Sequence, residues 1–169
     1  MENRKVIFGG NPVALSGNEV KIGDKASDFT LVNNALKPVK LSDYKGKVKL
    51  ISIFPSIDTS VCSIQNHKFN SEAGSYGDKV VFMAISVDLP FALKRFCGAE
   101  GINNLITLSD HREVEFGSKY GFVIKDLRLL ARGVIIIDKD DVIRYVEVVP
   151  EVGHEPNYEN ALKALKTLL

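Results

Sequence analysis

Hydrophobic positions along the chain gather in short runs that polar turns separate. Dense apolar and β-branched runs at residues 48–54 and 80–87 are typical of central strands covered on both faces. Two short runs around Gly-Gly-Asn, within residues 6–15, predict an N-terminal β-hairpin. Further apolar runs predict strands at residues 29–32, 39–41, 105–108, 134–137 and 142–149. The last two flank Asp-Lys-Asp-Asp at residues 138–141, which predicts a second hairpin turn.

Two segments in the middle of the chain carry the signals of helices. Capping side chains precede residues 60–75, where a first helix is expected. The apolar residues near one face of this helix are expected to point inward: Val61, Ile64 and Phe69. Pro90 opens a second helix over residues 90–97, which Gly98 is expected to close.

Two more helices complete the pattern. One is expected at residues 113–120, and the other follows Asn157, behind which apolar residues recur at helical spacing: Tyr158, Leu162, Leu165 and Leu169. The order of elements is thus a hairpin, then βαβαβα, then ββα. This order predicts an α/β fold in which a mixed sheet is flanked by helices. No repeat, low-complexity tract or linker divides residues 1–169, so a single domain is expected.

Composition and charge narrow the function classes. Hydrophobic residues make up 45% and charged residues 25% of the 169 positions, which is ordinary for a soluble globular protein. A net charge of +1 provides no electrostatic basis for binding nucleic acid or an anionic membrane. The longest aliphatic run is residues 134–137, far too short to span a bilayer. The N-terminus, Met-Glu-Asn-Arg-Lys, leads into no secretory signal, so a cytoplasmic location is expected.

The strongest chemical signal is a cysteine placed where a strand gives way to a helix. Residues 48–54 end before Pro55, and Thr59 is suited to cap the following helix. Cys62 then falls in the first helical turn, where free N–H groups and the positive end of the helix dipole favour a thiolate. The second cysteine, Cys97, lies on another expected helix. The two form neither a Cys-x-x-Cys pair nor half a zinc site, and two inert core thiols remain an alternative.

A helix terminus alone does not keep a sulfur ionised. A free cysteine, with a pKa near ~8.5, is only a few per cent thiolate at neutral pH. The helix dipole supplies typically ~0.3–1 kcal/mol, and a hydroxyl bond from Thr59 adds about 1 kcal/mol. A cation bonded to the sulfur is therefore expected. Arg132 is the candidate, because it stands at the head of the apolar run 134–137, where an unpaired charge is costly. A strand-end arginine that reaches solvent is the alternative.

Three segments together resemble a known family. The segment Pro55-Ser-Ile-Asp-Thr-Ser-Val-Cys62 is similar to the Pro-x-x-x-Thr-x-x-Cys motif of peroxiredoxins. Asp88-Leu-Pro-Phe-Ala92 and Arg95-Phe-Cys-Gly-Ala-Glu-Gly101 are similar to segments of the bacterial thiol peroxidases, which are peroxiredoxins of the atypical two-cysteine type. The resemblance covers nearly the whole chain. It implies a thioredoxin-like three-layer fold with an N-terminal hairpin, and a homodimer.

The same resemblance implies an activity and roles for five residues. Cys62 would be the peroxidatic cysteine, which attacks the peroxide, and Cys97 the resolving cysteine of the same subunit. Arg132 and Thr59 would hold sulfur and peroxide, and Pro55 would shield the sulfur from water. The expected substrates are hydrogen peroxide and alkyl or lipid hydroperoxides, with thioredoxin as reductant and no metal or cofactor. Disulfide formation would require the helix ends around Cys62 and Cys97 to unwind locally.

Two other function classes remain open from the residues. A Cys–His hydrolase would pair a cysteine with one of three scattered histidines: His67, His111 and His154. A non-catalytic thioredoxin-fold binding or chaperone module would use neither cysteine. Three phenylalanines are candidates to line an apolar approach to Cys62, and equally to lie in the core or an interface: Phe54, Phe91 and Phe96.

Overall fold

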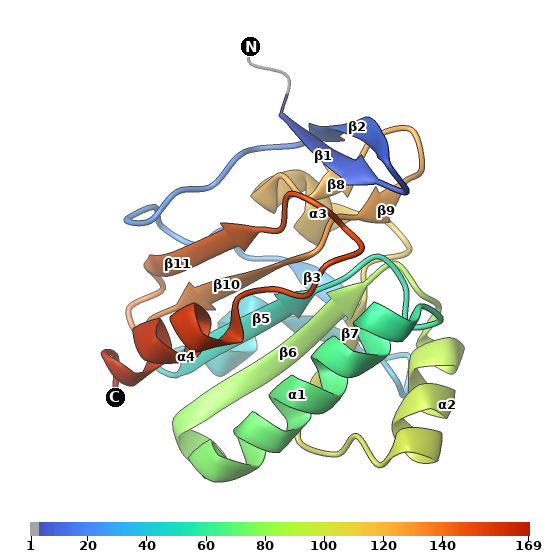
Figure 1. Ribbon diagram of the computed structural model, residues 1–169. Coiled ribbons are helices and arrows are strands. Elements are labelled where there is room, and N and C mark those ends of the chain that lie inside the picture. The colour runs from blue at the N-terminus through green and yellow to red at the C-terminus, as the bar shows by residue number, and fades with distance from the viewer. Residues whose placement is uncertain (1–3) are drawn as a thin grey trace.

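A mixed sheet runs through the protein, which is described here by a computed structural model covering residues 4–169 (Figure 1). Its seven strands have the spatial order β11 (Ile143–Val148), β10 (Gly133–Ile137), β5 (Val48–Ile53), β6 (Val80–Ser86), β7 (Ile106–Ser109), β3 (Thr30–Asn33) and β4 (Pro38–Lys40). The pairs β5–β6 and β6–β7 are parallel and the others antiparallel. Every residue of β5 and β6 is buried, as expected for central strands.

Helices cover both faces of this sheet, which makes three layers. Three of them lie on the near face in Figure 1: α1 (Ser60–Tyr76), α2 (Pro90–Glu100) and α4 (Tyr158–Lys166). They pack on the sheet through Phe69, Leu93 and Leu165. On the opposite face, α3 (Glu115–Tyr120) buries Phe116 and Tyr120. Two 3-10 turns, η1 (Leu41–Tyr44) and η2 (Gly77–Lys79), complete the helical segments. The thioredoxin-like α/β fold expected from the sequence is confirmed.

The N-terminal hairpin belongs to a second, smaller sheet. Its strands β1 (Lys5–Phe8) and β2 (Asn11–Ser16) are antiparallel and are joined by a turn at Gly9 and Gly10. On its other edge β2 pairs with β8 (Val123–Ile124), which in turn pairs with β9 (Leu129–Leu130). The sequence did not predict β8 and β9, because two-residue strands carry no periodicity. Two backbone bonds fix the hairpin to the segment after β11. Ile7 N donates to Pro150 O at 2.8 Å, and Val152 N donates to Ile7 O at 2.8 Å.

Several helix boundaries differ from the prediction. Helix α2 continues through Gly98 to Glu100 and is capped by Gly101, which has a left-handed φ of 67° and donates its N–H to the Cys97 carbonyl. A helix tolerates an interior glycine, and the left-handed end position is the one that selects glycine. Helix α3 starts at Glu115 rather than 113, because Val114 has a positive φ of 48°. The last helix ends at Lys166, so Leu169 lies beyond it.

The inward face of α1 also differs from the prediction. Phe69 is buried as expected, but Ile64 is 50% exposed. The buried positions beside Cys62 are taken by Gln65 and Asn66, whose amides bond to other buried groups. Polar residues at these buried positions mask the amphipathic pattern of the helix, so the prediction that Ile64 points inward was wrong.

The turn after β10 is a hairpin turn, as predicted. Asp138 Oδ1 accepts the N–H groups of Asp140 and Val142, and Oδ2 accepts a 2.7 Å bond from Arg144 Nε. Asp141, in the same turn, lies 2.6 Å from the ammonium of Lys49, whose side chain is fully buried in β5. Within residues 4–169, no helix is long and apolar enough to cross a membrane.

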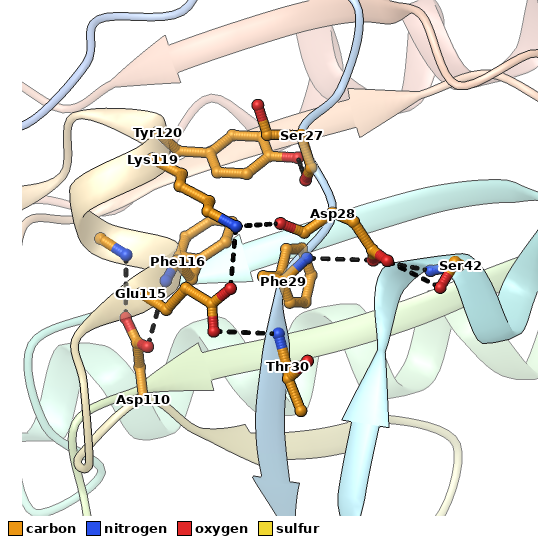
Figure 2. A network of polar contacts seen from close by, with 11 residues as sticks. Ser27, Asp28, Phe29, Thr30, Ser42, Asp110, Glu115, Phe116, Lys119 and Tyr120 are labelled. Atoms are coloured by element: carbon orange, nitrogen blue, oxygen red, sulfur yellow. Dashed lines mark hydrogen bonds and ion pairs between the residues drawn. The ribbon is translucent and has the colours of Figure 1, made fainter.

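A polar network fastens α3 to the sheet edge (Figure 2). Asp110, buried at the end of β7, accepts the N–H groups of Phe116 at 3.1 Å and Gly117 at 2.8 Å. Lys119 bridges Glu115, at 2.8 Å, and the carbonyl of Asp28. These contacts satisfy N–H groups at the start of α3 that have no partner within the helix.

Asp110 makes stability depend on pH. Burial raises the pKa of Asp110 from its ordinary 3.8 to about 6 and outweighs the hydrogen bonds from Gly117 and Phe116, which lower it. The folded protein therefore holds this proton more tightly than the unfolded chain. The corresponding stability is fully present below about pH 4 and is lost as the pH rises through about 6. At ~1.36 kcal/mol per pKa unit, the loss is about 3 kcal/mol.

Replacing Asp110 with asparagine removes this titration. Between pH 4 and pH 7, the wild type should lose about 3 kcal/mol of unfolding free energy that Asp110→Asn does not lose. Urea unfolding at several pH values measures the difference. The exposed carboxylate variant Asp126→Asn is the control for the loss of one negative charge. Parallel pH profiles for Asp110→Asn and the wild type would contradict the assignment.

Candidate active site

The junction between β5 and α1 places Cys62 in a buried first helical turn. Thr59 is the N-cap, with extended backbone angles of −98° and 146°, and its hydroxyl oxygen accepts the Cys62 N–H at 3.4 Å. Cys62 is 0% exposed. The Thr59 hydroxyl lies 2.7 Å from Cys62 Sγ and 3.2 Å from the Ser56 carbonyl. One hydroxyl proton serves one of these acceptors at a time, and an anionic sulfur is the stronger acceptor.

Arg132 is buried beside the same sulfur. It directly precedes β10, and its side chain is among the largest fully buried ones. Its Nη2 lies 3.3 Å from Cys62 Sγ, Nη1 donates to Gln65 Oε1 at 2.8 Å, and Nε donates to the Val152 carbonyl at 2.7 Å. The alternative of an arginine that reaches solvent is therefore wrong. No carboxylate of residues 4–169 pairs with this guanidinium, so its charge is available to stabilise a thiolate.

Gln65 orients the guanidinium and was missed by the sequence reasoning. Its amide nitrogen donates to Ser52 Oγ at 2.7 Å and to the Ile53 carbonyl at 3.2 Å, which leaves Oε1 directed at Arg132. The signal available in the sequence was a glutamine one helical turn after Cys62, on the same face. Its meaning depends on Ser52 and Arg132, which the sequence does not place beside it.

A small pocket opens onto these groups. Its volume is about 140 Å³, and its wall is mostly apolar, built by Phe8, Gly9, Pro55, Thr59, Val61, Arg132, Val152 and Gly153. Pro55, Thr59 and Arg132 thus converge here with Cys62 beneath them. The tip of the N-terminal hairpin, Phe8 and Gly9, closes one side, which the sequence did not predict.

The three phenylalanines considered for this approach lie elsewhere. Phe54 is fully buried in the core below, Phe91 is 66% exposed on α2, and Phe96 packs edge-on against His67. None of them lines the pocket.

Cys97 occupies a different environment from Cys62. It lies in the last turn of α2, is partly exposed, and its Sγ is 3.7 Å from Thr107 Oγ1 and 3.9 Å from Asn34 Nδ2. Both cysteines are free thiols. The structure therefore gathers four of the five predicted site residues and leaves Cys97 in surroundings of its own.

The histidines do not approach the site sulfur. His67 is exposed and lies 3.2 Å from Glu100, His111 lies in the turn between β7 and α3, and His154 is exposed between β11 and α4. Among residues 4–169, the side chains bonded to Cys62 Sγ are Thr59 and Arg132. A Cys–His hydrolase needs an imidazole within hydrogen-bond reach of its sulfur, so this geometry does not support one.

Comparison with known proteins shows the family to which this chain belongs. The family model described as Redoxin matches residues 21–162. The crystal structure of a peroxiredoxin-like protein from Aquifex aeolicus superposes with a TM-score of 0.92 and 40% identity, covering 98% of each chain. A thiol peroxidase from Chromobacterium violaceum shares the fold, with a TM-score of 0.87 at 22% identity over 98% of this chain and 97% of the other. The chain belongs to the redoxin family.

Curated relatives narrow the assignment within that family. The thiol peroxidase of Listeria monocytogenes serotype 4b is 57% identical over 162 residues, which cover 96% of this chain and 98% of the relative. The thiol peroxidase of Bacillus subtilis is 50% identical over 165 residues, covering 98% of both. This protein is one of the thiol peroxidases, within the peroxiredoxin group.

Proposed function

We propose that the protein reduces hydrogen peroxide and organic hydroperoxides at Cys62 and then forms an intramolecular Cys62–Cys97 disulfide, which thioredoxin reduces. The observation that supports this most is the buried Cys62 sulfur held between a hydroxyl at 2.7 Å and an unpaired guanidinium at 3.3 Å, under a small pocket. Membership of the thiol peroxidases supports the reaction type.

In the first half of the cycle, the Cys62 thiolate attacks one peroxide oxygen. The S–O bond forms as the O–O bond breaks, and the other oxygen leaves as water or an alcohol after it takes up a proton. Cys62 is left as a sulfenic acid. A lower thiol pKa also reduces nucleophilicity, so the larger rate gain must come from stabilising the transition state.

Arg132 and Thr59 are placed to stabilise that transition state. Arg132 and Thr59 both line the pocket above the sulfur, and each already bonds to Sγ. When the thiolate attacks, the same donors can turn toward the oxygens on which negative charge develops. Pro55 lines the same pocket, and we infer that it keeps water from competing for these donors.

The apolar wall of the pocket favours the binding of organic hydroperoxides as well as hydrogen peroxide. Phe8, Val61 and Val152 surround the approach, and burying an alkyl group against them contributes roughly 0.8 kcal/mol per methylene. Hydrogen peroxide lacks such a group, so we expect alkyl hydroperoxides to bind more tightly.

In the second half, the Cys97 sulfur attacks the sulfenic sulfur. The S–S bond forms, the S–O bond breaks and water leaves. A disulfide tolerates Cα separations only up to about 6.8 Å, while here each thiol is fixed by its own neighbours. We infer that the first turn of α1 and the last turn of α2 unwind for this step. Faster hydrogen exchange of both turns in the oxidised protein tests it.

Mass spectrometry after one equivalent of peroxide tests the proposed function. We expect the intact mass to fall by two hydrogens, with a peptide that joins positions 62 and 97. Two unlinked thiols after peroxide treatment, with the peroxide unconsumed, would contradict the proposal.

The remaining expectations concern partners and location. We infer a homodimer, one domain over residues 1–169, thioredoxin as the dithiol reductant, and a part in antioxidant defence. A cytoplasmic location fits a cycle that must return both cysteines to thiols. Sedimentation, cell fractionation and turnover with a thioredoxin system test these points separately.

A further inference from the structure

Asp88 connects the two helices that carry the cysteines. It follows β6 and precedes α2, within the segment Asp88-Leu-Pro-Phe-Ala92, and the peroxide chemistry described above does not use it. Its carboxylate accepts three hydrogen bonds: from Ser86 Oγ at 2.7 Å, from Ser56 Oγ at 2.9 Å and from Ile57 N at 2.8 Å. Ser86 is its near neighbour, but Ser56 and Ile57 belong to the loop that leads into α1.

This loop links the Asp88 carboxylate to Cys62 through a short series of hydrogen bonds. The Ser56 carbonyl accepts the N–H of Thr59 at 3.2 Å, and Thr59 caps α1 and touches Cys62 Sγ. On its other side, the Asp88 carbonyl accepts a bond from the buried Ser109 hydroxyl. The carboxylate thus fastens residues 56–59 to the rigid end of the central sheet, and at the same point the chain enters α2.

We propose that Asp88 is a positioning residue that latches the loop of residues 56–59 in the conformation that reacts with peroxide, and that this latch opens before the disulfide forms. The inference rests on the proposed two-cysteine cycle. Two of the three bonds join the carboxylate to the loop, and they favour the folded loop because hydrogen bonds to a charged group are stronger than bonds between neutral groups. The bond from Ser86 holds the carboxylate itself in place. The same bonds must slow any unwinding that brings Cys62 toward Cys97.

A second contact between the same segments provides a matched control. Asp58 and Arg95 join the loop to α2 by an ion pair at 3.6 Å, but both side chains are 72% exposed. Exposed ion pairs contribute little, so Asp58→Asn should leave both half-reactions nearly unchanged. Asp88→Ala removes all three bonds, and Asp88→Asn keeps one acceptor oxygen. Ser56→Ala removes the bond to Asp88 and also the bond that Ser56 Oγ accepts from Asp58 N at 3.2 Å.

The two half-reactions are measured separately. The rate of Cys62 oxidation by hydrogen peroxide is followed in a Cys97→Ser background, where the disulfide cannot form. Asp88→Ala should lower this rate about tenfold, because Thr59 and Cys62 lose their alignment. With Cys97 present, the conversion of sulfenic acid to disulfide should become several-fold faster, and more peroxide should be needed to overoxidise Cys62. Asp88→Asn and Ser56→Ala should also slow the oxidation of Cys62 and speed disulfide formation, by smaller factors. For Ser56→Ala we expect a change of about threefold in each rate.

The opposite signs of the two effects distinguish a latch from general damage. A variant that is merely less stable would slow both steps, and that result overturns the proposal, as would unchanged rates in Asp88→Ala. If Asp88→Ala does not fold, Ser56→Ala with hydrogen exchange of residues 55–64 decides, since the latch requires faster exchange there. The proposed function fails differently: wild-type protein would then form no disulfide with peroxide.

Discussion

Cys62→Ser is expected to lose peroxide reduction by at least about 1,000-fold, because a serine hydroxyl is barely ionised and its oxygen is not a target for two-electron oxidation. The hydrogen bonds from Thr59 and Arg132 would remain, but they would hold an unreactive oxygen. Peroxide consumption with a thioredoxin system measures the effect.

Cys97→Ser is the matched control for the same experiment. It should keep the first peroxide turnover, since Cys97 contacts Thr107 and Asn34 rather than the pocket. It should lose thioredoxin-linked cycling and accumulate sulfinic acid at Cys62, because nothing condenses with the sulfenic acid. Full peroxidase activity in Cys62→Ser would refute the assignment of the nucleophile.

Arg132→Met should lower kcat/KM for peroxide by about 100- to 1,000-fold, the usual effect of removing a transition-state donor. Methionine fills much of the same space but removes the charge beside Cys62 Sγ and leaves Gln65 Oε1 and the Val152 carbonyl without their donor. Arg132→Lys keeps the charge. One ammonium cannot reproduce a planar fork with three partners, so we expect a loss of about tenfold.

Alkylation by iodoacetamide separates the two roles of Arg132. If the guanidinium stabilises the thiolate, the alkylation of Cys62 in Arg132→Met should require a higher pH. If it stabilises only the transition state, alkylation should stay unchanged while peroxide reduction falls. Arg144→Met, on β11 close to the turn that follows β10, removes a cation that pairs with Asp138 and should change neither reaction. Wild-type rates in Arg132→Met would contradict the site.

Local sequence features determined much of the fold and the centre of the site. Apolar runs identified the buried strands β5 and β6, because full burial on both faces demands such runs. Thr59 as a cap and Cys62 in the first helical turn followed from a few adjacent residues, and the structure has both in place. Arg132 was a candidate because a charge beside an apolar strand needs a partner, and the resemblance to peroxiredoxins decided between this role and an arginine that reaches solvent.

What the sequence could not determine depends on groups far apart along the chain. Gln65 orients Arg132, the hairpin tip with Phe8 closes the pocket, and Asp88 holds the loop at Ser56; each contact joins residues that only the tertiary fold brings together. The end of α2 at Gly101 was missed for a related reason: whether a glycine stays helical or turns left-handed depends on the packing that follows it. Periodicity and capping are short-range and readable from sequence, whereas hydrogen bonds between distant side chains exist only once the sheet and its helices are assembled.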